Sequence, residues 1–323
     1  YAASSLNGGY KSGQPTAGTF EVKFTAKGYF DAAAQAVLVS GQVTILDVQM
    51  TPWPSHLISG KVLEKGAGAP IPDAIVFLEN QDFNYTAKTD ANGAFSLPSV
   101  LIGDYSVAVG EWGFENIFLE KLTVDGNKDL LFESGKAYQD NFNTDLGWAV
   151  SSNATDGFWE RGIPLGTEAA GSFFNPPIDS PNDPGKYAYV TGNQGIFAND
   201  DDVDAGATIL TSPPMLLKSR YNRPLISYDT WFFEPDGNTP GNDTLVVSLD
   251  NGKERIVLET VDDNVQQWRP SAVFDVSQLM EMTDDMRLIF YTSDYNPDYH
   301  FLEVGLDNFK VTEGIPDEYF SVA

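Results

Sequence analysis

Residues 1–50 repeat residues 86–135 at a constant offset of 85 positions, and no other feature of the sequence constrains the fold as strongly. Gly18–Phe24 corresponds to Gly103–Val109, and Asn7-Gly8 corresponds to Asn92-Gly93. Glycine, aromatic and alternating apolar positions agree without a gap, so both segments are expected to form the same supersecondary unit. The first copy contains only the second half of that unit, and we expect its opening strands to lie before Tyr1.

The complete copy is predicted to be a small β-sandwich. Asn92-Gly93 favours a tight hairpin turn, and the residues on both sides of it alternate between apolar and polar. Two prolines in Thr51–Ser55 are incompatible with a central strand and indicate a linker between the copies. Short strands at the spacing of an antiparallel sandwich are expected at Leu57–Glu64, Ala74–Leu78, Tyr85–Thr89, Ala94–Leu97, Tyr105–Val109, Ile117–Val124 and Asp129–Phe132.

A second kind of β-domain is expected after Tyr138. Residues 155–208 are rich in Gly, Pro, Asn and Asp and predict a long loop system, and Ser277–Thr283 is compatible with one helical turn. Strong alternation predicts strands at Leu225–Phe233, Thr244–Leu249, Arg255–Thr260, Ser271–Val276, Arg287–Tyr291 and Leu302–Val311. The expected organisation is half a repeat unit at 1–50, a complete unit at 51–136, a larger β-domain at 137–313 and a connector tail at 314–323.

Composition excludes several classes of function. The chain has 46 acidic and 19 basic residues, which argues against nucleic acid as a partner, because phosphate contacts need stripes of Lys and Arg. It has no Cys, so disulfides, thiol nucleophiles and thiolate metal sites are excluded. No apolar run is long enough for membrane insertion.

The complete repeat copy resembles the carboxypeptidase regulatory-like domain. The resemblance rests on Ser59–Val62, Pro70–Val76, Thr89–Phe95 and Gly103–Tyr105, and it covers Ser55–Phe132. It implies a transthyretin-like β-sandwich of the kind found beside zinc carboxypeptidases and in many bacterial surface proteins. The fold class expected for the chain is therefore all-β.

Residues Tyr138–Thr312 resemble a MAM-like jelly-roll module. The resemblance rests on Gly157–Pro164, Asp202–Asp204, Leu210–Pro213 and Glu303–Phe309. It implies tandem transthyretin-like sandwiches followed by a jelly-roll sandwich, an arrangement similar to the C-terminal accessory region of secreted bacterial zinc carboxypeptidases.

The zinc site of such an enzyme is not expected in this chain. A zinc carboxypeptidase needs a His-x-x-Glu pair and a distant His, and the only histidines here are His56 and His300. His300 and Glu303 have the spacing of that pair, but the surrounding residues predict a strand, on which the two side chains point to opposite faces. No catalytic residue is assigned, and Zn²⁺ is expected only in a catalytic domain outside this chain.

The acidic run around Asp200, Asp202 and Asp204 is the candidate metal site. Closely spaced carboxylates repel each other unless a cation or solvent relieves them, and a flexible cage of oxygen ligands suits a structural Ca²⁺. Ala205 and Thr211 replace the Gly and Glu of an EF-hand loop, so the run is not an EF-hand. In jelly-roll modules calcium commonly ties a long loop to the first or last strand, which here implies Asp140 or Asp307. The alternative is a solvated acidic loop.

Trp159, Glu160 and Arg161 form the candidate ligand-binding group. They lie in a segment bounded by Gly and Pro, where an indole ring could stack on a sugar. The alternative is that these side chains only fix the loop, because most tryptophans of the domain lie in or beside alternating strands and are expected in the core.

Three functions remain open. The first is a non-catalytic accessory region of a secreted zinc metallocarboxypeptidase-like protein, acting as spacer, folding support and substrate or surface contact. The second is a cell-surface adhesin or filament subunit, and the third is a glycan-binding module. In each case the expected location is extracellular or at the cell surface, and the expected partners are other domains of the same protein and an extracellular protein or glycan.

Overall fold

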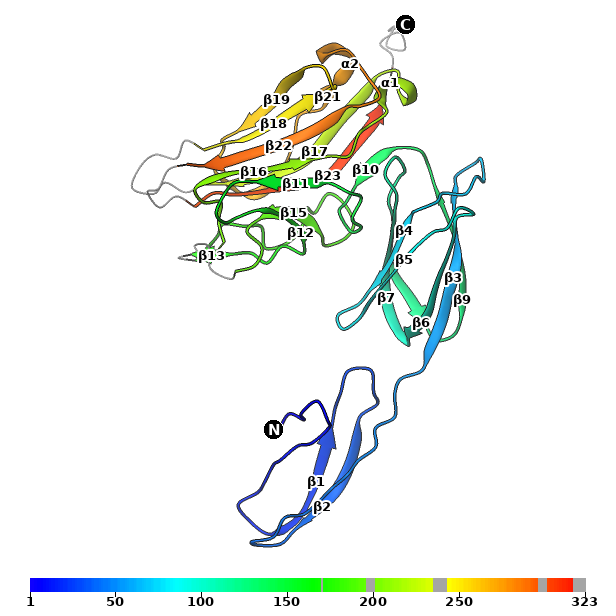
Figure 1. Cartoon of the computed structure of the whole chain (residues 1–323), viewed down its shortest axis with the longest axis vertical. Helices are drawn as coiled ribbons and strands as arrows, with labels where there is room; N and C mark the ends of the chain where they lie inside the picture. The colour runs from blue at the N-terminus through cyan, green and yellow to red at the C-terminus, as the bar shows by residue number, and fades with distance from the viewer. Residues whose placement is uncertain (170, 196–200, 235–242, 296–300, 316–323) are drawn as a thin grey trace, which may run out of the picture.

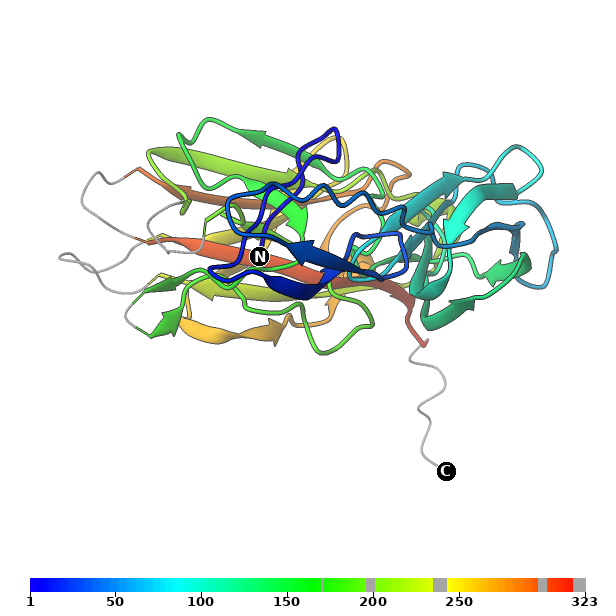
Figure 2. The ribbon, with the colours of Figure 1, turned by 90° about the horizontal axis from the view of Figure 1, so that it is seen from below.

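The structure is a computed structural model that describes residues 1–169, 171–195, 201–234, 243–295 and 301–315. Its regular structure consists almost entirely of β-strands, which confirms the predicted all-β class. Three bodies follow one another along the chain, from the hairpin at the N-terminal end to the largest sandwich (Figures 1 and 2). Among the described residues, no helix is long and apolar enough to cross a membrane.

The N-terminal body is one antiparallel pair of strands, β1 (Gly18–Phe24) and β2 (Ala32–Leu38). Adding 85 to their residue numbers gives two strands of the next body, β7 (Gly103–Gly110) and β8 (Ile117–Val124). The backbones agree as well, because Gly8, Gly18 and Gly28 have positive φ angles, as do their counterparts Gly93, Gly103 and Gly113. These conformations favour glycine, so the repeat preserves the turns as well as the strands.

The second body is a sandwich of two sheets, and each predicted strand of the complete repeat copy is present. The strands that complete it are β3 (Ser55–Glu64), β4 (Ile75–Glu79), β5 (Asn84–Lys88), β6 (Ala94–Leu101) and β9 (Lys128–Ser134). One sheet has the order β6-β3-β9 and the other β5-β4-β7-β8. The pair β3–β9 is parallel, whereas the other pairs are antiparallel. Apolar side chains from alternating positions, such as Ile58, Leu78 and Val107, fill the space between the sheets.

The third body is a larger sandwich. Its first sheet has the order β12-β15-β23-β17-β20, with β10 also paired to β23 and β21 to β17. These strands are β10 (Tyr138–Asp140), β12 (Trp159–Gly162), β15 (Ala188–Thr191), β17 (Pro224–Phe233), β20 (Val265–Pro270), β21 (Phe274–Asp275) and β23 (Glu303–Glu313). The first and last strands of this body, β10 and β23, are therefore neighbours, with Tyr138 opposite Val311.

The second sheet of this body has the order β11-β16-β22-β18-β19. Its strands are β11 (Ala149–Ser152), β16 (Gly206–Thr211), β18 (Leu245–Asp250), β19 (Arg255–Val261) and β22 (Arg287–Asp294). Trp148, Phe290 and Phe309 pack between the two sheets, where the Trp148 ring meets Phe309 edge-to-face and Phe290 at a tilt. Outside the sheets lie the short hairpin β13 (Glu168–Ala169) and β14 (Ser172–Phe173) and two one-turn helices, α1 (Leu217–Arg220) and α2 (Val276–Leu279).

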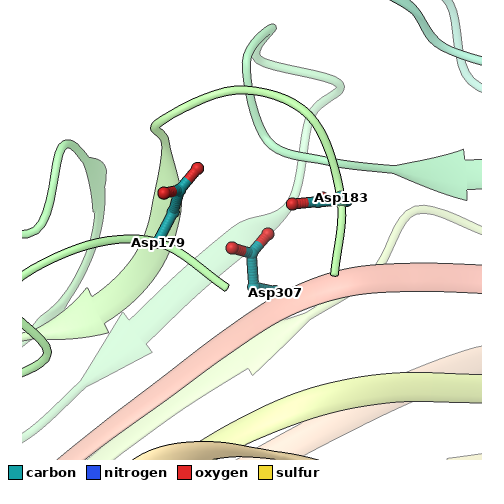
Figure 3. A group of neighbouring side chains, drawn as sticks. All are labelled: Asp179, Asp183 and Asp307. Atoms are coloured by element: carbon teal, nitrogen blue, oxygen red, sulfur yellow. The ribbon is translucent and has the colours of Figure 1, made fainter. Parts of the chain in front are cut away.

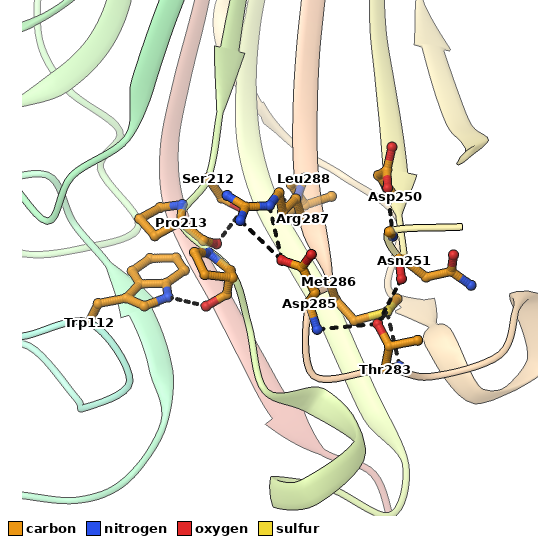
Figure 4. A network of polar contacts seen from close by, with 12 residues as sticks. Trp112, Ser212, Pro213, Asp250, Asn251, Thr283, Asp285, Met286, Arg287 and Leu288 are labelled. Carbon is orange, nitrogen blue, oxygen red and sulfur yellow. Dashed lines mark hydrogen bonds and ion pairs between the residues drawn. The ribbon is translucent and has the colours of Figure 1, made fainter. Parts of the chain in front are cut away.

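Trp112 joins the second body to the third. Its ring stacks on Phe309 at 5.9 Å and meets Trp148 edge-on at 6.0 Å. Its Nε1 donates to the Pro214 carbonyl at 2.8 Å, a bond visible at Trp112 in Figure 4. Arg220 of the third body donates back to the Gly113 carbonyl at 2.7 Å. Aromatic packing and hydrogen bonds therefore fix the two sandwiches against each other.

Candidate metal centre

The candidate site lies on the outer face of β23. Val304 and Leu306 of this strand point into the core, so Glu303, Gly305 and Asp307 face the opposite side of the sheet. After Asp307 the alternation changes, because Asn308 has a φ of 50° and the register against β17 shifts between Ser227 and Asp229. This bulge brings Phe309 back into the core and leaves Asp307 at the kink.

A segment comprising residues 163–187, here called the covering segment, closes this outer face. Trp231 Nε1 donates to the Phe174 carbonyl at 2.7 Å, and Trp268 Nε1 donates to the Ile178 carbonyl at 2.8 Å. Gly305 makes room for both indoles, since a Cβ there would lie 2.8 Å from the Trp268 ring. The face that carries Asp307 is therefore buried although it lies outside the sandwich core.

Asp179 and Asp183 of the covering segment meet Asp307 above β23 (Figure 3). One donor oxygen from each of the three carboxylates lies within 4.8 Å of the others. A Ca²⁺ ion holds its oxygen ligands at 2.3–2.6 Å, so opposite ligands are about 5 Å apart. The spacing of the three oxygens thus fits a cation of this size.

Burial makes this arrangement unfavourable without a positive charge. Asp307 is 0% exposed, and both carboxylate oxygens of Asp183 are buried with no donor facing them among the described residues, so Asp183 and Asp307 can hydrogen-bond only by sharing a proton. Within the described residues, none of the three carboxylates forms an ion pair with a lysine, arginine or histidine. A bound cation would supply the missing partner.

The pKa values of the three carboxyl groups show that burial disfavours their charged forms. Burial, with the charges of Asp179 and Asp229, raises the pKa of Asp183 to about 8. Burial raises the pKa of Asp179 to about 6. Burial and the neighbouring Asp183 raise the pKa of Asp307 well above its ordinary value. Three hard oxygen donors with no nitrogen or sulfur ligand are the chemistry that Ca²⁺ prefers.

A second ring of polar groups orients the ligands. Ser180 donates its backbone N–H to Asp307 Oδ2 at 2.8 Å and its hydroxyl to Asp229 Oδ2 at 2.5 Å. Asp229 lies opposite Asp307 on β17 and also accepts from Asn182 and Asn308. The loop carrying Asp179 and Asp183 is therefore held on the strand carrying Asp307 by bonds that do not use the free oxygens of Asp183.

The predicted metal ligands fall in different places. Asp307 is in the cluster, and Asp140 is buried beside it, where it accepts from Trp148 Nε1 at 2.9 Å and raises the pKa of Asp183. Asp202 and Asp204 lie near Asp156 and Asp294, and Asp202 also raises the pKa of Glu303, the first residue of β23. Asp200 lies outside the described residues.

Sequence reasoning missed Asp179 and Asp183, although they were visible as a pattern. Both lie in the run Asp179–Pro184, where two aspartates are separated by Ser, Pro and Asn. Such a run favours turns whose carboxylates can converge. The run falls within the region predicted as a long loop system, and no signal in the sequence indicates that it crosses β23.

The predicted ligand-binding group lies on β12. Trp159 is 2% exposed and packs in the core, so its ring presents no face on which a sugar could stack. Glu160 Oε1 accepts from Gln194 Nε2, and Arg161 donates to the Phe142 carbonyl and lies over the Tyr187 ring. A ligand-binding role for this group stays a prediction that would depend on Glu160 and Arg161.

Comparison with known proteins identifies one part of the chain. Residues 57–132 match the family of carboxypeptidase regulatory-like domains, so the second body is a domain of this family. No curated protein matches the chain.

Solved structures match the chain at low similarity. A type II cohesin–X-dockerin complex from Acetivibrio cellulolyticus is 23% identical with a TM-score of 0.21, over 24% of this chain and 56% of that chain. The K1 cleaved adhesin domain of Lys-gingipain from Porphyromonas gingivalis is 12% identical with a TM-score of 0.32, over 56% of this chain and 100% of that domain. SGBP-B from a complex xyloglucan utilization locus in Bacteroides uniformis is 14% identical with a TM-score of 0.27, over 97% of this chain and 85% of that chain. At this level of similarity, none of them carries an argument about what this chain binds.

Proposed function

We propose that this chain is a non-catalytic accessory module of an extracellular or cell-surface protein, in which a calcium-stabilised sandwich and a regulatory-like domain form one rigid arm. The observation that carries the proposal is the cluster of Asp179, Asp183 and Asp307, whose buried oxygens need a cation. The arm acts as a spacer and presents the third body to an extracellular protein or glycan.

The cation also supports the proposed location. Extracellular modules typically bind calcium with dissociation constants of about 10⁻⁴–10⁻³ M, whereas cytosolic sites must be far tighter. A site with three carboxylates, two of them only partly buried, suits the millimolar calcium found outside cells. The one group of three close metal-ligating side chains in the described residues contains only aspartates, an oxygen-only set that suits Ca²⁺ better than Zn²⁺.

The test is a calcium titration of the chain, monitored by its melting temperature. We expect Ca²⁺ to raise the melting temperature of the wild type, with saturation in the millimolar range, because the ion binds only the folded state. Asp183→Asn should reduce this gain without lowering the melting temperature in EDTA, because asparagine resembles the protonated aspartate that burial favours in the metal-free protein but removes a charged ligand. Asp262→Asn removes an exposed aspartate of the same domain and should keep the full gain.

Two results would overturn the proposal. If the wild type melted at the same temperature in calcium and in EDTA, no cation would stabilise the fold. Hydrolysis of peptide substrates by this chain, with or without added Zn²⁺, would show that it is not merely accessory.

A further inference from the structure

A second group of buried acids lies at the start of β23, four residues before Asp307. Glu303 and Asp307 are four residues apart on the strand, which corresponds to about 13 Å. Glu303 is 0% exposed, and its Oε2 accepts from Thr191 Oγ1 at 2.6 Å. Its Oε1 is buried without a hydrogen-bond partner in the part of the chain that the structure describes. A buried carboxylate oxygen of this kind is rare unless something positive faces it.

Other oxygen atoms face Glu303 Oε1. A Cβ on Gly192 would lie 2.8 Å from Oε1 and would collide with the backbone carbonyl oxygen of Asp201. The absence of a side chain on Gly192 thus leaves a carboxylate oxygen and a carbonyl oxygen next to the same point. Asp202 follows directly and is itself buried.

The surrounding charges are negative as well. Burial, with the charges of Asp202 and Asp201, raises the pKa of Glu303 well above its ordinary value. Burial, with the charges of Asp204, Asp294 and Asp156, raises the pKa of Asp202 to about 8. None of Glu303, Asp201 and Asp202 forms an ion pair with a basic side chain among the described residues. The site therefore has several oxygen donors and, among the described residues, no basic side chain that pairs with them.

We propose that Glu303 and Asp202, together with the carbonyl oxygen of Asp201, bind a second hard divalent cation, of which Ca²⁺ is the expected one. Glu303 Oε1 and the Asp201 carbonyl are the preformed ligands, and the Asp202 carboxylate completes the set when the ion enters. The ion ties Asp201 and Asp202 to the start of β23. This site is separate from the Asp179–Asp183–Asp307 cluster, so it goes beyond the proposed function and can fail without it.

A protonated Glu303 that donates to the Asp201 carbonyl is the competing explanation, and Glu303→Gln separates the two. A glutamine can still donate a hydrogen bond at this position, but it removes the charge that a cation needs. If the competing explanation held, the variant would bind calcium as the wild type does.

The experiment counts bound ions by calorimetric titration of the metal-free chain with Ca²⁺. We expect two ions in the wild type, one in Glu303→Gln, one in Asp183→Asn and none in the double variant. Glu254→Gln, an exposed glutamate of the same domain, should keep two ions. An unchanged stoichiometry and affinity in Glu303→Gln overturns the second site and leaves the first intact, whereas an unchanged Asp183→Asn overturns only the first.

A second variant covers the case in which Glu303→Gln does not fold. Asp202→Asn changes a side chain nearer the surface and should also reduce the stoichiometry from two ions to one. If Asp202→Asn folds, as judged by its far-UV circular dichroism, and still binds two ions with wild-type affinity, the second site does not exist.

Discussion

Gly305 is the residue on which the covered face of β23 depends. An added Cβ would lie 2.8 Å from the Trp268 ring and 3.1 Å from the Trp231 Cβ, and both indoles hold the covering segment through their N–H groups. We expect Gly305→Ala to destabilise the fold by about 1–3 kcal/mol, as overpacking does. Urea unfolding measures this loss. Gly126→Ala is the control, because nothing lies within 4 Å of its Cβ position, and an equal loss there would contradict the explanation.

Asp183 makes calcium binding depend on pH. Its pKa is raised to about 8 in the absence of a cation, so below that pH the metal-free protein holds a proton that a cation must displace. The calcium affinity of the Asp179–Asp183–Asp307 site should therefore increase as the pH rises from about 6 to 8 and level off above. Calorimetric titration of Glu303→Gln at several pH values isolates this site. A constant affinity over that range would mean that Asp183 is already ionised without the metal.

The covering segment is the element that calcium should control. It contains only the short hairpin β13–β14 and is otherwise held by single hydrogen bonds to the sheet, such as those of Trp231 and Ser180. Chelation should accelerate tryptic cleavage after Lys186, near the end of this segment, by releasing Asp179 and Asp183 from β23. Cleavage after Lys65, in an exposed turn of the second body, is the internal reference and should be the same with and without calcium. Equal rates at Lys186 in both conditions would show that the segment is held without the ion.

The long alternating strands could be predicted from the sequence, and the covering segment could not. Leu225–Phe233 and Leu302–Val311 alternate strongly, and they became β17 and β23. Asp307 was predicted because it lies on the last strand, where a cation site of the resembled family is expected. Asp179 and Asp183 reach it through a long irregular segment whose path is set by tertiary contacts with Trp231 and Trp268, and a local pattern carries no information about such contacts. Trp159 was the least core-like tryptophan in sequence, because its glycine- and proline-bounded setting hides the short strand that buries it.

At the scale of the whole molecule, Trp112 decides whether the two sandwiches behave as one body. Its ring contacts Tyr138, Trp148 and Phe309 of the third body. Trp112→Ala should cost about 3 kcal/mol at this interface and change a single calorimetric unfolding transition into two. Trp53→Ala is the matched control, because Trp53 contacts Phe30 and Phe83 in the first two bodies and should leave the third body coupled. A single transition in Trp112→Ala would mean that the remaining contacts are enough to couple the unfolding of the two sandwiches.

The pairing of β10 with β23 determines how the third body would respond to a pulling force. Tyr138 lies opposite Val311, so the chain enters and leaves this sandwich at neighbouring points. A force that pulls on both ends of this body would act only across the two adjacent strands β10 and β23. The rest of the sandwich would carry no load. Because the two strands are antiparallel, the load would open their hydrogen bonds one pair at a time instead of shearing them together. Under tension the third body would therefore behave as a side branch of the arm proposed above.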